Sequence, residues 1–359
     1  MMNLFCRPLT TDHWPLSFPR RAAFFFILTL LFFRGAEAEI HFAYPPGLDS
    51  PTLETVVSDI SEADLRRVTE TLTGEEYAGR EFGTEHGCRA AEFIADELLA
   101  YGYAPTFQEI PEWVYEDYGA GQNVLAVLPG SDPELADTYI VLCAHYDHLG
   151  AREFPEPVYY PGADDNAGSV AVLLSVAKAL KQLPTAPKRS ILFLFTDGEE
   201  KGLLGARFWA AYPTVPHENI LLAVNLDMTG RLNEKSRLYI FAARTGTNLE
   251  AWCHAGNTAE EPLELIFPWS ALPRADHAAF LEQEIPVLLV VTGLSPFYHT
   301  PRDTVDTLNF PGMKRISEFI FRTAVRMACA ESVTEYREEW ECERCQEEDE
   351  MAGFFEESS

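Results

Sequence analysis

Acidic and imidazole side chains occur in five short motifs, and three of these directly follow an apolar run of residues. The motifs are His145-Tyr146-Asp147-His148, Asp164-Asp165-Asn166, Asp197-Gly198-Glu199-Glu200, Asp227 and Tyr298-His299-Thr300. Each motif alone is typical of an ordinary protein surface, since an aspartate before a helix, for example, is a common N-cap. Gathered in one place, the carboxylates would repel one another, and metal cations bound at about 2.0–2.2 Å would remove that cost. The residue types therefore predict a metal site assembled from all five motifs.

Six apolar runs alternate with helical patterns along the chain, and this order predicts the fold. The runs expected to form strands are 123–128, 139–144, 190–195, 220–226, 237–242 and 285–291. The segments with helical spacing are 59–102, 167–183, 203–211, 249–257, 277–284 and 311–330. This alternation indicates an α/β fold with a mostly parallel (mixed) central sheet and helices on both faces. Sites in such sheets form outside the carboxyl ends of the strands, so the motifs are expected to meet there.

The first 38 residues have the pattern of a secretory signal peptide. Arg20-Arg21 precedes twelve residues in which Thr29 is the only polar one, and Ala36-Glu37-Ala38 supplies an A-x-A cleavage site. A transmembrane helix needs about 20 apolar residues, so this run is too short to span a bilayer. An uncleaved N-terminal anchor is the alternative. We expect export to the periplasm or the extracellular space, without stable membrane insertion after cleavage.

The remaining chain is expected to form one domain over 39–330, followed by an acidic tail over 331–359. The 27 Lys+Arg and 56 Asp+Glu residues give a net charge of −29, and 47% of the residues are hydrophobic. That much apolar material can build a large core, whereas a nucleic-acid partner would require a basic face. The tail holds twelve acidic and two basic residues. Its Cys342-x-x-Cys345 pair has no second pair, so a zinc ribbon is disfavoured, while Cys143 is expected to be a buried thiol.

The motifs, read with their neighbours, resemble the secreted bacterial di-zinc aminopeptidases, metallopeptidase family twenty-eight. The matching runs are His145-Tyr146-Asp147-His148-Leu149-Gly150, Gly162-Ala163-Asp164-Asp165-Asn166-Ala167-Gly168, Gly198-Glu199-Glu200-Lys201-Gly202-Leu203-Leu204-Gly205, Asn225-Leu226-Asp227-Met228 and Tyr298-His299-Thr300-Pro301-Arg302-Asp303-Thr304. They follow the family's order, and the likeness covers roughly residues 70–330, including Gly79-Arg80 and Gly83-Thr84.

The resemblance implies a pair of zinc ions and assigns five ligands to them. Asp165 bridges the two ions. His145 and Asp227 complete the first zinc site, and Glu200 and His299 complete the second. Two protein ligands plus the bridge would leave each zinc an open position for water or substrate.

The resemblance also implies two catalytic carboxylates, with Glu199 as the general base and Asp147 as the partner of His145. A histidine ligand usually donates its other N–H to a carboxylate, and Asp147 is close enough in sequence to accept it. Asp276 matches a family Ser-Asp-His motif only in part, because Ala275 replaces the serine. His148 is expected to be a hydrogen-bonding neighbour of the site and not a ligand.

The implied activity is the release of N-terminal residues from peptides that carry a free N-terminus. An acidic cluster would attract the free amine, and the negative surface would favour cationic ends. Two alternatives remain, a single-zinc glutaminyl cyclase-like acyltransferase and a receptor-like relative without metals. The filled ligand positions disfavour the second. Five loop aromatics are candidates to line a substrate pocket, namely Tyr159, Tyr160, Phe267, Trp269 and Phe297.

Overall fold

The computed structural model describes residues 40–114, 118–153, 157–338 and 340. The expected signal peptide and most of the acidic tail, including Cys342 and Cys345, lie outside these described residues. Within them, no helix is both long and apolar enough to cross a membrane. The cysteines at positions 88, 143, 253 and 329 are free, and Cys143 is buried as expected.

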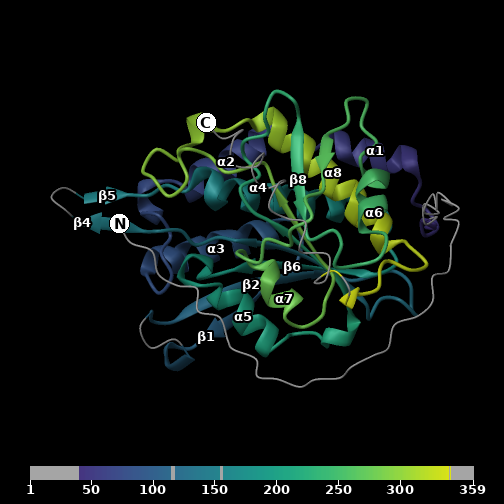
Figure 1. The fold of residues 1–359 in the computed structure, drawn as a ribbon, viewed down its shortest axis with the longest axis horizontal. Helices are drawn as coiled ribbons and strands as arrows, with labels where there is room; N and C mark the ends of the chain where they lie inside the picture. The colour runs from purple at the N-terminus through teal and green to yellow at the C-terminus, as the bar shows by residue number, and fades with distance from the viewer. Residues whose placement is uncertain (1–39, 115–117, 154–156, 339, 341–359) are drawn as a thin grey trace, which may run out of the picture. The chain divides into compact units, whose positions relative to one another are not determined.

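An eight-stranded mixed sheet forms the centre of the fold (Figure 1). Its strands are β1 (Thr106–Ile110), β2 (Gly121–Leu128), β3 (Tyr139–His145), β6 (Ser190–Thr196), β7 (Ile220–Leu226), β8 (Arg237–Phe241), β9 (Glu264–Ile266) and β10 (Val287–Val291). The spatial order is β1-β2-β6-β3-β7-β10-β8-β9. The central strands β6, β3, β7 and β10 are parallel, which confirms the predicted α/β class.

The sheet is mixed, as expected, but the sequence did not show which two of the six predicted runs are antiparallel to the central strands. Strand β2 pairs antiparallel with β6 and with β1, and β8 pairs antiparallel with β10. The physical reason is that an apolar run records burial on both faces of a sheet, and burial is the same for either strand direction. Direction depends on the connection and the partner strand.

Helices cover both faces of the sheet, as predicted. They are α1 (Ser50–Ser58), α2 (Glu62–Leu72), α3 (Glu85–Ala100), α4 (Ser169–Gln182), α5 (Leu204–Ala211), α6 (Leu249–Gly256), α7 (His277–Leu281) and α8 (Phe310–Ala328). Successive residues of β3 point to opposite faces. Leu142 belongs to the core shared with α4 and α8, whereas Cys143 belongs to the core that contains Trp209 of α5 and Phe280 of α7. Figure 1 shows α5 and α7 in the lower half of the view and α4, α6 and α8 in the upper half.

Several short elements differ from the sequence prediction. The single helical segment expected over 59–102 is two helices, α2 and α3, because residues 73–84 turn through positive φ at Gly79, Arg80 and Gly83. Helix α1, strands β1 and β9, and the hairpin of β4 (Ala151–Glu153) and β5 (Pro157–Tyr159) were not predicted. These elements are short, so their apolar periodicity is weak.

The first residues of the expected tail contact the domain. Val333 is buried, and its carbonyl accepts a hydrogen bond of 2.7 Å from the indole of Trp252. Tyr336 forms an isolated bridge with Gly246. The described part of the tail therefore packs against α6 and the loop that follows β8.

Arg80 joins three parts of the chain from a fully buried position. Its guanidinium donates to the carbonyls of Tyr146 at 2.8 Å, Leu72 and Pro161 at 2.7 Å, and Gly162 at 3.0 Å. Burial lowers its pKa to about 10. These bonds tie the end of α2 and the loop before α4 to the residue that follows His145.

We expect Arg80→Met to lower the free energy of unfolding by roughly 3–5 kcal/mol, because it leaves four buried carbonyls without a donor. Urea denaturation of the purified protein measures this loss. Arg89→Met is the matched control, since Arg89 is exposed and, within the described part of the chain, forms an ion pair with Glu85 one turn away on α3. A loss for Arg80→Met no larger than that of the control would contradict the prediction.

Candidate metal centre

The parallel strands place three of the predicted motifs at one edge of the sheet. His145 is the last residue of β3, and Asp227 directly follows β7. Glu199 and Glu200 lie in a single 3-10 turn just after β6. Because β6, β3 and β7 are parallel neighbours, their carboxyl ends lie side by side. The expectation that these motifs meet at the carboxyl edge is therefore correct.

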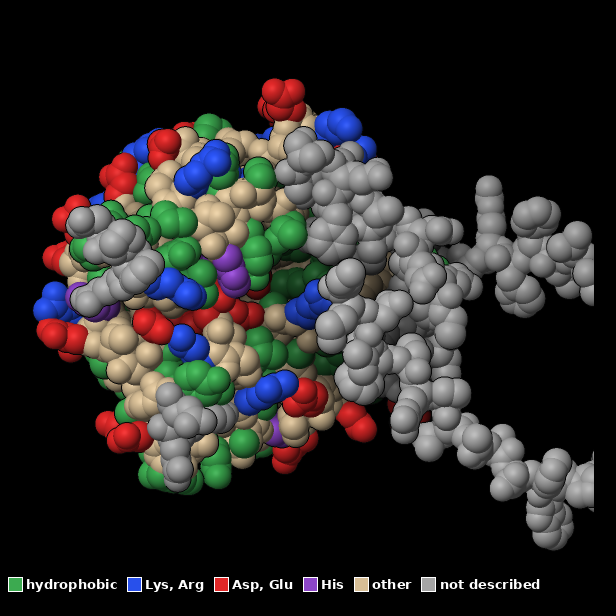
Figure 2. Space-filling model, turned by 60° about the vertical axis from the view of Figure 1, so that its left-hand side comes forward, with side chains coloured by type: hydrophobic (Ala, Val, Ile, Leu, Met, Phe, Trp, Pro, Cys, Tyr) green, Lys and Arg blue, Asp and Glu red, His purple; other side chains and the backbone are tan. Residues whose placement is uncertain are grey.

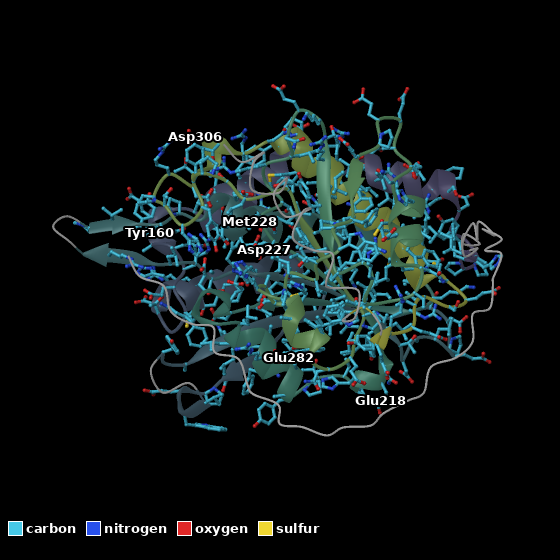
Figure 3. The ribbon with its side chains drawn as sticks, viewed as in Figure 1. Tyr160, Glu218, Asp227, Met228, Glu282 and Asp306 are labelled. Atoms are coloured by element: carbon cyan, nitrogen blue, oxygen red, sulfur yellow. The ribbon has the colours of Figure 1, made fainter. Side chains whose placement is uncertain are left out.

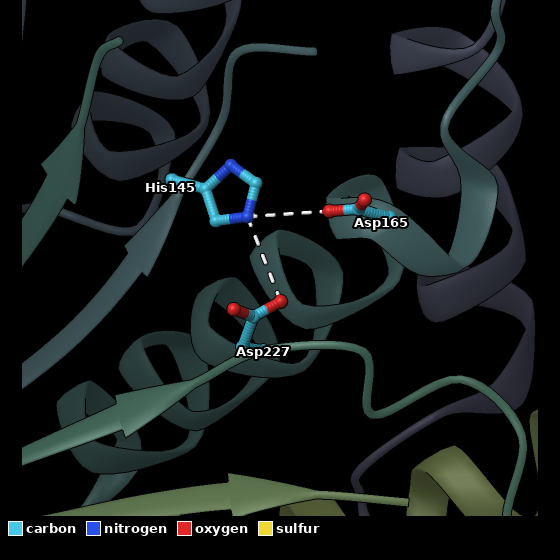
Figure 4. A group of neighbouring side chains, drawn as sticks. All are labelled: His145, Asp165 and Asp227. Carbon is cyan, nitrogen blue, oxygen red and sulfur yellow. Dashed lines mark ion pairs between the residues drawn. The ribbon is translucent and has the colours of Figure 1, made fainter. Parts of the chain in front are cut away.

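One group of possible ligands consists of His145, Asp165 and Asp227 (Figure 4). The Nε2 atom of His145 lies 3.3 Å from Oδ1 of Asp165 and 3.6 Å from Oδ1 of Asp227. All three side chains are buried. Asp165 comes from the irregular turn over Ala163–Gly168 that precedes α4.

A second group surrounds the other oxygen of Asp165. The Nε2 atom of His299 lies 3.2 Å from Oδ2 of Asp165 and 3.0 Å from Oε2 of Glu200. The Nδ1 atom of His148 lies 2.8 Å from Oε1 of Glu200 and 3.8 Å from Oδ2 of Asp165. The structure thus brings all five predicted ligands together, and it adds His148, which was expected only as a neighbour, to the second group.

The donor atoms of both groups fit divalent cations such as zinc. Oδ2 of Asp165, Oδ1 of Asp227, Oε1 of Glu200 and Nε2 of His299 are buried, make no well-aligned hydrogen bond to the described residues and face other members of the two groups. Leaving charged groups in this state costs several kcal/mol each unless a cation compensates them. Carboxylate oxygens and imidazole nitrogens are ordinary zinc donors.

The electrostatics of the cluster favour positive charge at its centre. Burial by itself would raise the pKa of Asp165, but contacts with His145 and His299 hold that pKa well below its usual range. Burial opposes the charged form of His145 as well. The neighbouring carboxylates, of which Glu199 contributes most, nevertheless raise the pKa of His145 well above its usual value.

Asp147 makes the predicted contact with His145 and also two that the sequence did not indicate. Its Oδ1 lies 3.5 Å from Nδ1 of His145, and its backbone carbonyl lies closer to the same nitrogen, at 3.2 Å. Its two carboxylate oxygens accept hydrogen bonds from the backbone N–H groups of Glu199, at 3.0 Å, and Glu200, at 3.2 Å. One buried carboxylate therefore orients an imidazole of the first group and the turn that carries Glu200 of the second.

Glu199 faces a cavity of about 180 Å³ beside the two groups. Burial raises the pKa of Glu199 well above its usual value, with repulsion from Asp227 and Glu200 adding to the shift. The cavity is also lined by Asp165 and Asp227 and by apolar residues, among them Met228, Leu289 and Val291. In Figure 2, acidic and histidine side chains lie next to a hollow with hydrophobic walls.

The residues expected to line a substrate pocket are not those that do. None of the five loop aromatics named above belongs to the cavity wall, and Trp269, for example, packs against the guanidinium of Arg244. Tyr298 does line the cavity, and its ring is stacked on that of His299 with 3.7 Å between the ring centroids. Its position next to a predicted ligand was the only sequence signal for it. Asp276 is buried and accepts a hydrogen bond from the hydroxyl of Thr196.

A buried ion-pair cluster supports the Asp165 turn, and the sequence did not reveal it. The carboxylate of Asp303 accepts hydrogen bonds from the backbone N–H groups of Asp164, at 3.1 Å, and Asp165, at 3.0 Å. Arg231 lies 3.2 Å from both carboxylates, and Asp164 accepts a bond of 2.8 Å from the N–H of Gly230. Arg231 follows Asp227 by four residues, and Asp303 follows His299 by four. The cluster therefore ties together three loops that carry possible ligands.

Comparisons with known proteins identify what the chain resembles. Residues 123–324 match the model of Peptidase family M28. Leucine aminopeptidase 1 from Arthroderma otae is 23% identical over 313 residues, which cover 82% of each chain. The LapA aminopeptidase of Legionella pneumophila has a similar fold, with a TM-score of 0.66, 21% identity and coverage of 81% of this chain and 78% of its own. The glutaminyl cyclase of Porphyromonas gingivalis also matches, with a TM-score of 0.62, 21% identity and coverage of 74% and 98%.

We expect Asp303→Asn to weaken zinc binding by about tenfold or more, although Asp303 contacts the backbone of Asp165 and not its carboxylate. An asparagine keeps one acceptor oxygen but turns an NH₂ group towards the backbone donors and Arg231. Competition with a chromophoric chelator measures the zinc affinity. Asp306→Asn is the control, because Asp306 is exposed, accepts its side-chain hydrogen bond from nearby Thr304 and lies apart from Asp227 in Figure 3. Equal affinities for the two variants would contradict the prediction.

Proposed function

The chain belongs to peptidase family M28, and from that premise we propose that it is a zinc-dependent aminopeptidase that releases N-terminal residues from peptides. We further propose that it uses two zinc ions per chain and Glu199 as the general base. The peptidase domain in this proposal spans residues 39–330.

The observation that carries the proposal is the double use of Asp165. Its Oδ1 faces His145, whereas its Oδ2 faces His299. A carboxylate with one oxygen directed to each of two ligand groups is the arrangement that a pair of cations requires. A single-metal site would need only one of the groups.

In this proposal His145 and Asp227 would hold one zinc ion, Glu200 and His299 the other, and Asp165 both. When bound, the pair would polarise the scissile carbonyl and activate water near neutral pH. Asp147 contacts Nδ1 of His145 and so keeps that imidazole in position. Its carboxylate also accepts hydrogen bonds from the backbone N–H groups of Glu199 and Glu200, which keeps their turn in place.

Glu199 is the group that moves the proton. Its carboxylate lines the cavity and is not needed as a ligand, since Glu200 takes that part in the same turn. The pKa of Glu199 is raised by burial, which suits a base that accepts a proton from water and passes it to the leaving amine. Tyr298 lines the same cavity, and burial raises the pKa of its hydroxyl, so it remains a hydrogen-bond donor for the substrate carbonyl.

The negative charge in the cavity supports cleavage at the end of a peptide. Asp165, Glu199 and Asp227 line one cavity, and a free N-terminal amine would be attracted to them. A mid-chain peptide bond brings no such charge. Residues 1–38 are proposed as a signal peptide, so that the mature enzyme acts in the periplasm or outside the cell.

The second candidate function is that of a glutaminyl cyclase, because solved structures of such enzymes have the same fold. As a single-zinc acyltransferase, this chain would need only one of the two ligand groups. The presence of Glu200 and His299 beside the second oxygen of Asp165 favours the aminopeptidase.

Metal content and activity of the purified mature protein test the proposal together. We expect two zinc ions per chain after equilibration and desalting, measured by elemental mass spectrometry, and release of leucine from leucyl peptides. Removal of the ions with a chelator should abolish the release, and added zinc should restore it. One ion with cyclisation of glutaminyl peptides would favour the alternative, and no bound ion would overturn both.

Glu199→Gln should lower kcat/KM by a factor of roughly 10²–10⁴, because the amide cannot accept the proton, while two zinc ions remain bound. Single-turnover assays and metal analysis on the same sample separate these effects. Glu218→Gln, at an exposed glutamate away from Asp227 in Figure 3, should behave as the unmodified protein. Near-normal turnover of Glu199→Gln would remove Glu199 from the role of base.

A further inference from the structure

Arg274 contributes the only basic side chain to the described wall of the cavity. The rest of the wall is acidic on the side of the ligand groups and apolar elsewhere. A cation in such a wall is unexpected in a chain with a net charge of −29. A role for this cation in substrate binding rests on the proposed aminopeptidase function.

The apolar part of the wall is built by β10 and β8. Leu289 and Val291 are two residues apart on β10, so they point to the same face of the sheet. They pair across the strands with Phe241 and Tyr239 of β8 and form one apolar cluster with them. This surface suits the methylene groups of a side chain and provides no partner for a charge.

The backbone at Arg274 is held close to this surface. Its N–H donates to the carbonyl of Leu272 at 2.6 Å, and Leu272 and Ala275 line the same cavity. The two residues that follow Arg274, Ala275 and Asp276, are buried, and this fixes the backbone on the C-terminal side of the arginine. Arg274 itself is exposed, so part of its side chain reaches solvent while the residue lines the cavity.

The charge of Arg274 is available to a ligand. Among the residues that the structure describes, no carboxylate lies within ion-pair distance of its guanidinium and no aromatic ring stacks on it. Bound zinc would offset the charge of Asp165 and Asp227. Glu199, the proposed general base, and Arg274 would then be the two remaining charged groups of the described wall, and Arg274 is the one free to contact the substrate side chain.

We propose that Arg274 is a specificity-determining residue that makes the cavity favour N-terminal glutamate over N-terminal lysine. The methylene groups of a glutamate side chain pack on Leu289 and Val291, and its carboxylate can form a paired hydrogen bond with the guanidinium. A lysine side chain that lies along the same surface brings its ammonium group towards the guanidinium, which carries the same charge. This local preference is opposite to the preference for cationic ends that the overall surface charge predicts.

The test compares kcat/KM for glutamyl, leucyl and lysyl p-nitroanilides in the zinc-loaded protein. Measurements at about 0.15 M salt screen exposed charges that lie more than about 8 Å away. We expect the ratio of glutamyl to lysyl kcat/KM to exceed one. Arg274→Met should lower this ratio by about tenfold, and Arg274→Glu should invert it, because the variant carries the opposite charge. Hydrolysis of the uncharged leucyl substrate should change little.

Arg302→Glu is the matched control. Arg302 is an exposed arginine in the loop of His299, and it does not line the cavity. If this variant shifts the ratio as much as Arg274→Glu does, the effect is a general one of charge and the proposal is wrong. Unchanged zinc content and melting temperature of each variant establish that the site is intact.

Two other outcomes would overturn the proposal and leave the proposed function in place. The ratio could stay constant in Arg274→Glu while leucine is still released. Alternatively, Arg274→Met could slow the hydrolysis of the dipeptide Leu-Gly but not that of Leu-Gly amide, which lacks the C-terminal carboxylate. The guanidinium would then bind the C-terminal carboxylate of short peptides and not a substrate side chain. Failure of the unmodified protein to release any N-terminal residue would instead refute the proposed function itself.

Discussion

Repulsion among buried carboxylates is the constraint on which the candidate site depends. Asp147, Asp165 and Asp227 are almost fully buried at the carboxyl edge of the sheet, with Glu199 and Glu200 beside them. Charges so close together in a medium of low polarity would oppose folding unless cations or imidazolium groups offset them. The position of Asp165 between two ligand groups follows from this constraint, because one carboxylate can then serve two cations.

The surrounding chain holds these groups in place mainly through backbone hydrogen bonds. Asp147 binds the N–H groups of the Glu199–Glu200 turn, and Asp303 binds those of the Asp165 turn. Arg80 donates hydrogen bonds to the carbonyls of Tyr146 and Gly162 near the same edge. In each case a charged side chain that is not itself a proposed ligand fixes the loop on which a ligand is carried. Such supports determine how closely the donor atoms can approach a metal ion.

Two levels of electrostatics act on a substrate in this proposal. The net charge of −29 attracts cationic molecules from a distance, and this attraction weakens as salt is added. Inside the cavity the relevant charges are few, and Arg274 is one of them. The charge that the cavity favours in a bound side chain can therefore differ from the charge that the whole surface favours in an approaching molecule.

The sequence by itself determined the chemistry of the site, because carboxylate and imidazole residues at the ends of apolar runs retain their identity whatever the exact fold. The seven candidate residues, the family and the α/β class could all be read from these motifs. Only the tertiary structure decided the directions of β2 and β8, the second contact of Asp147, the role of Arg231 and the residues that line the cavity. Those features depend on contacts between segments far apart in the chain, and no local pattern of residues encodes such contacts.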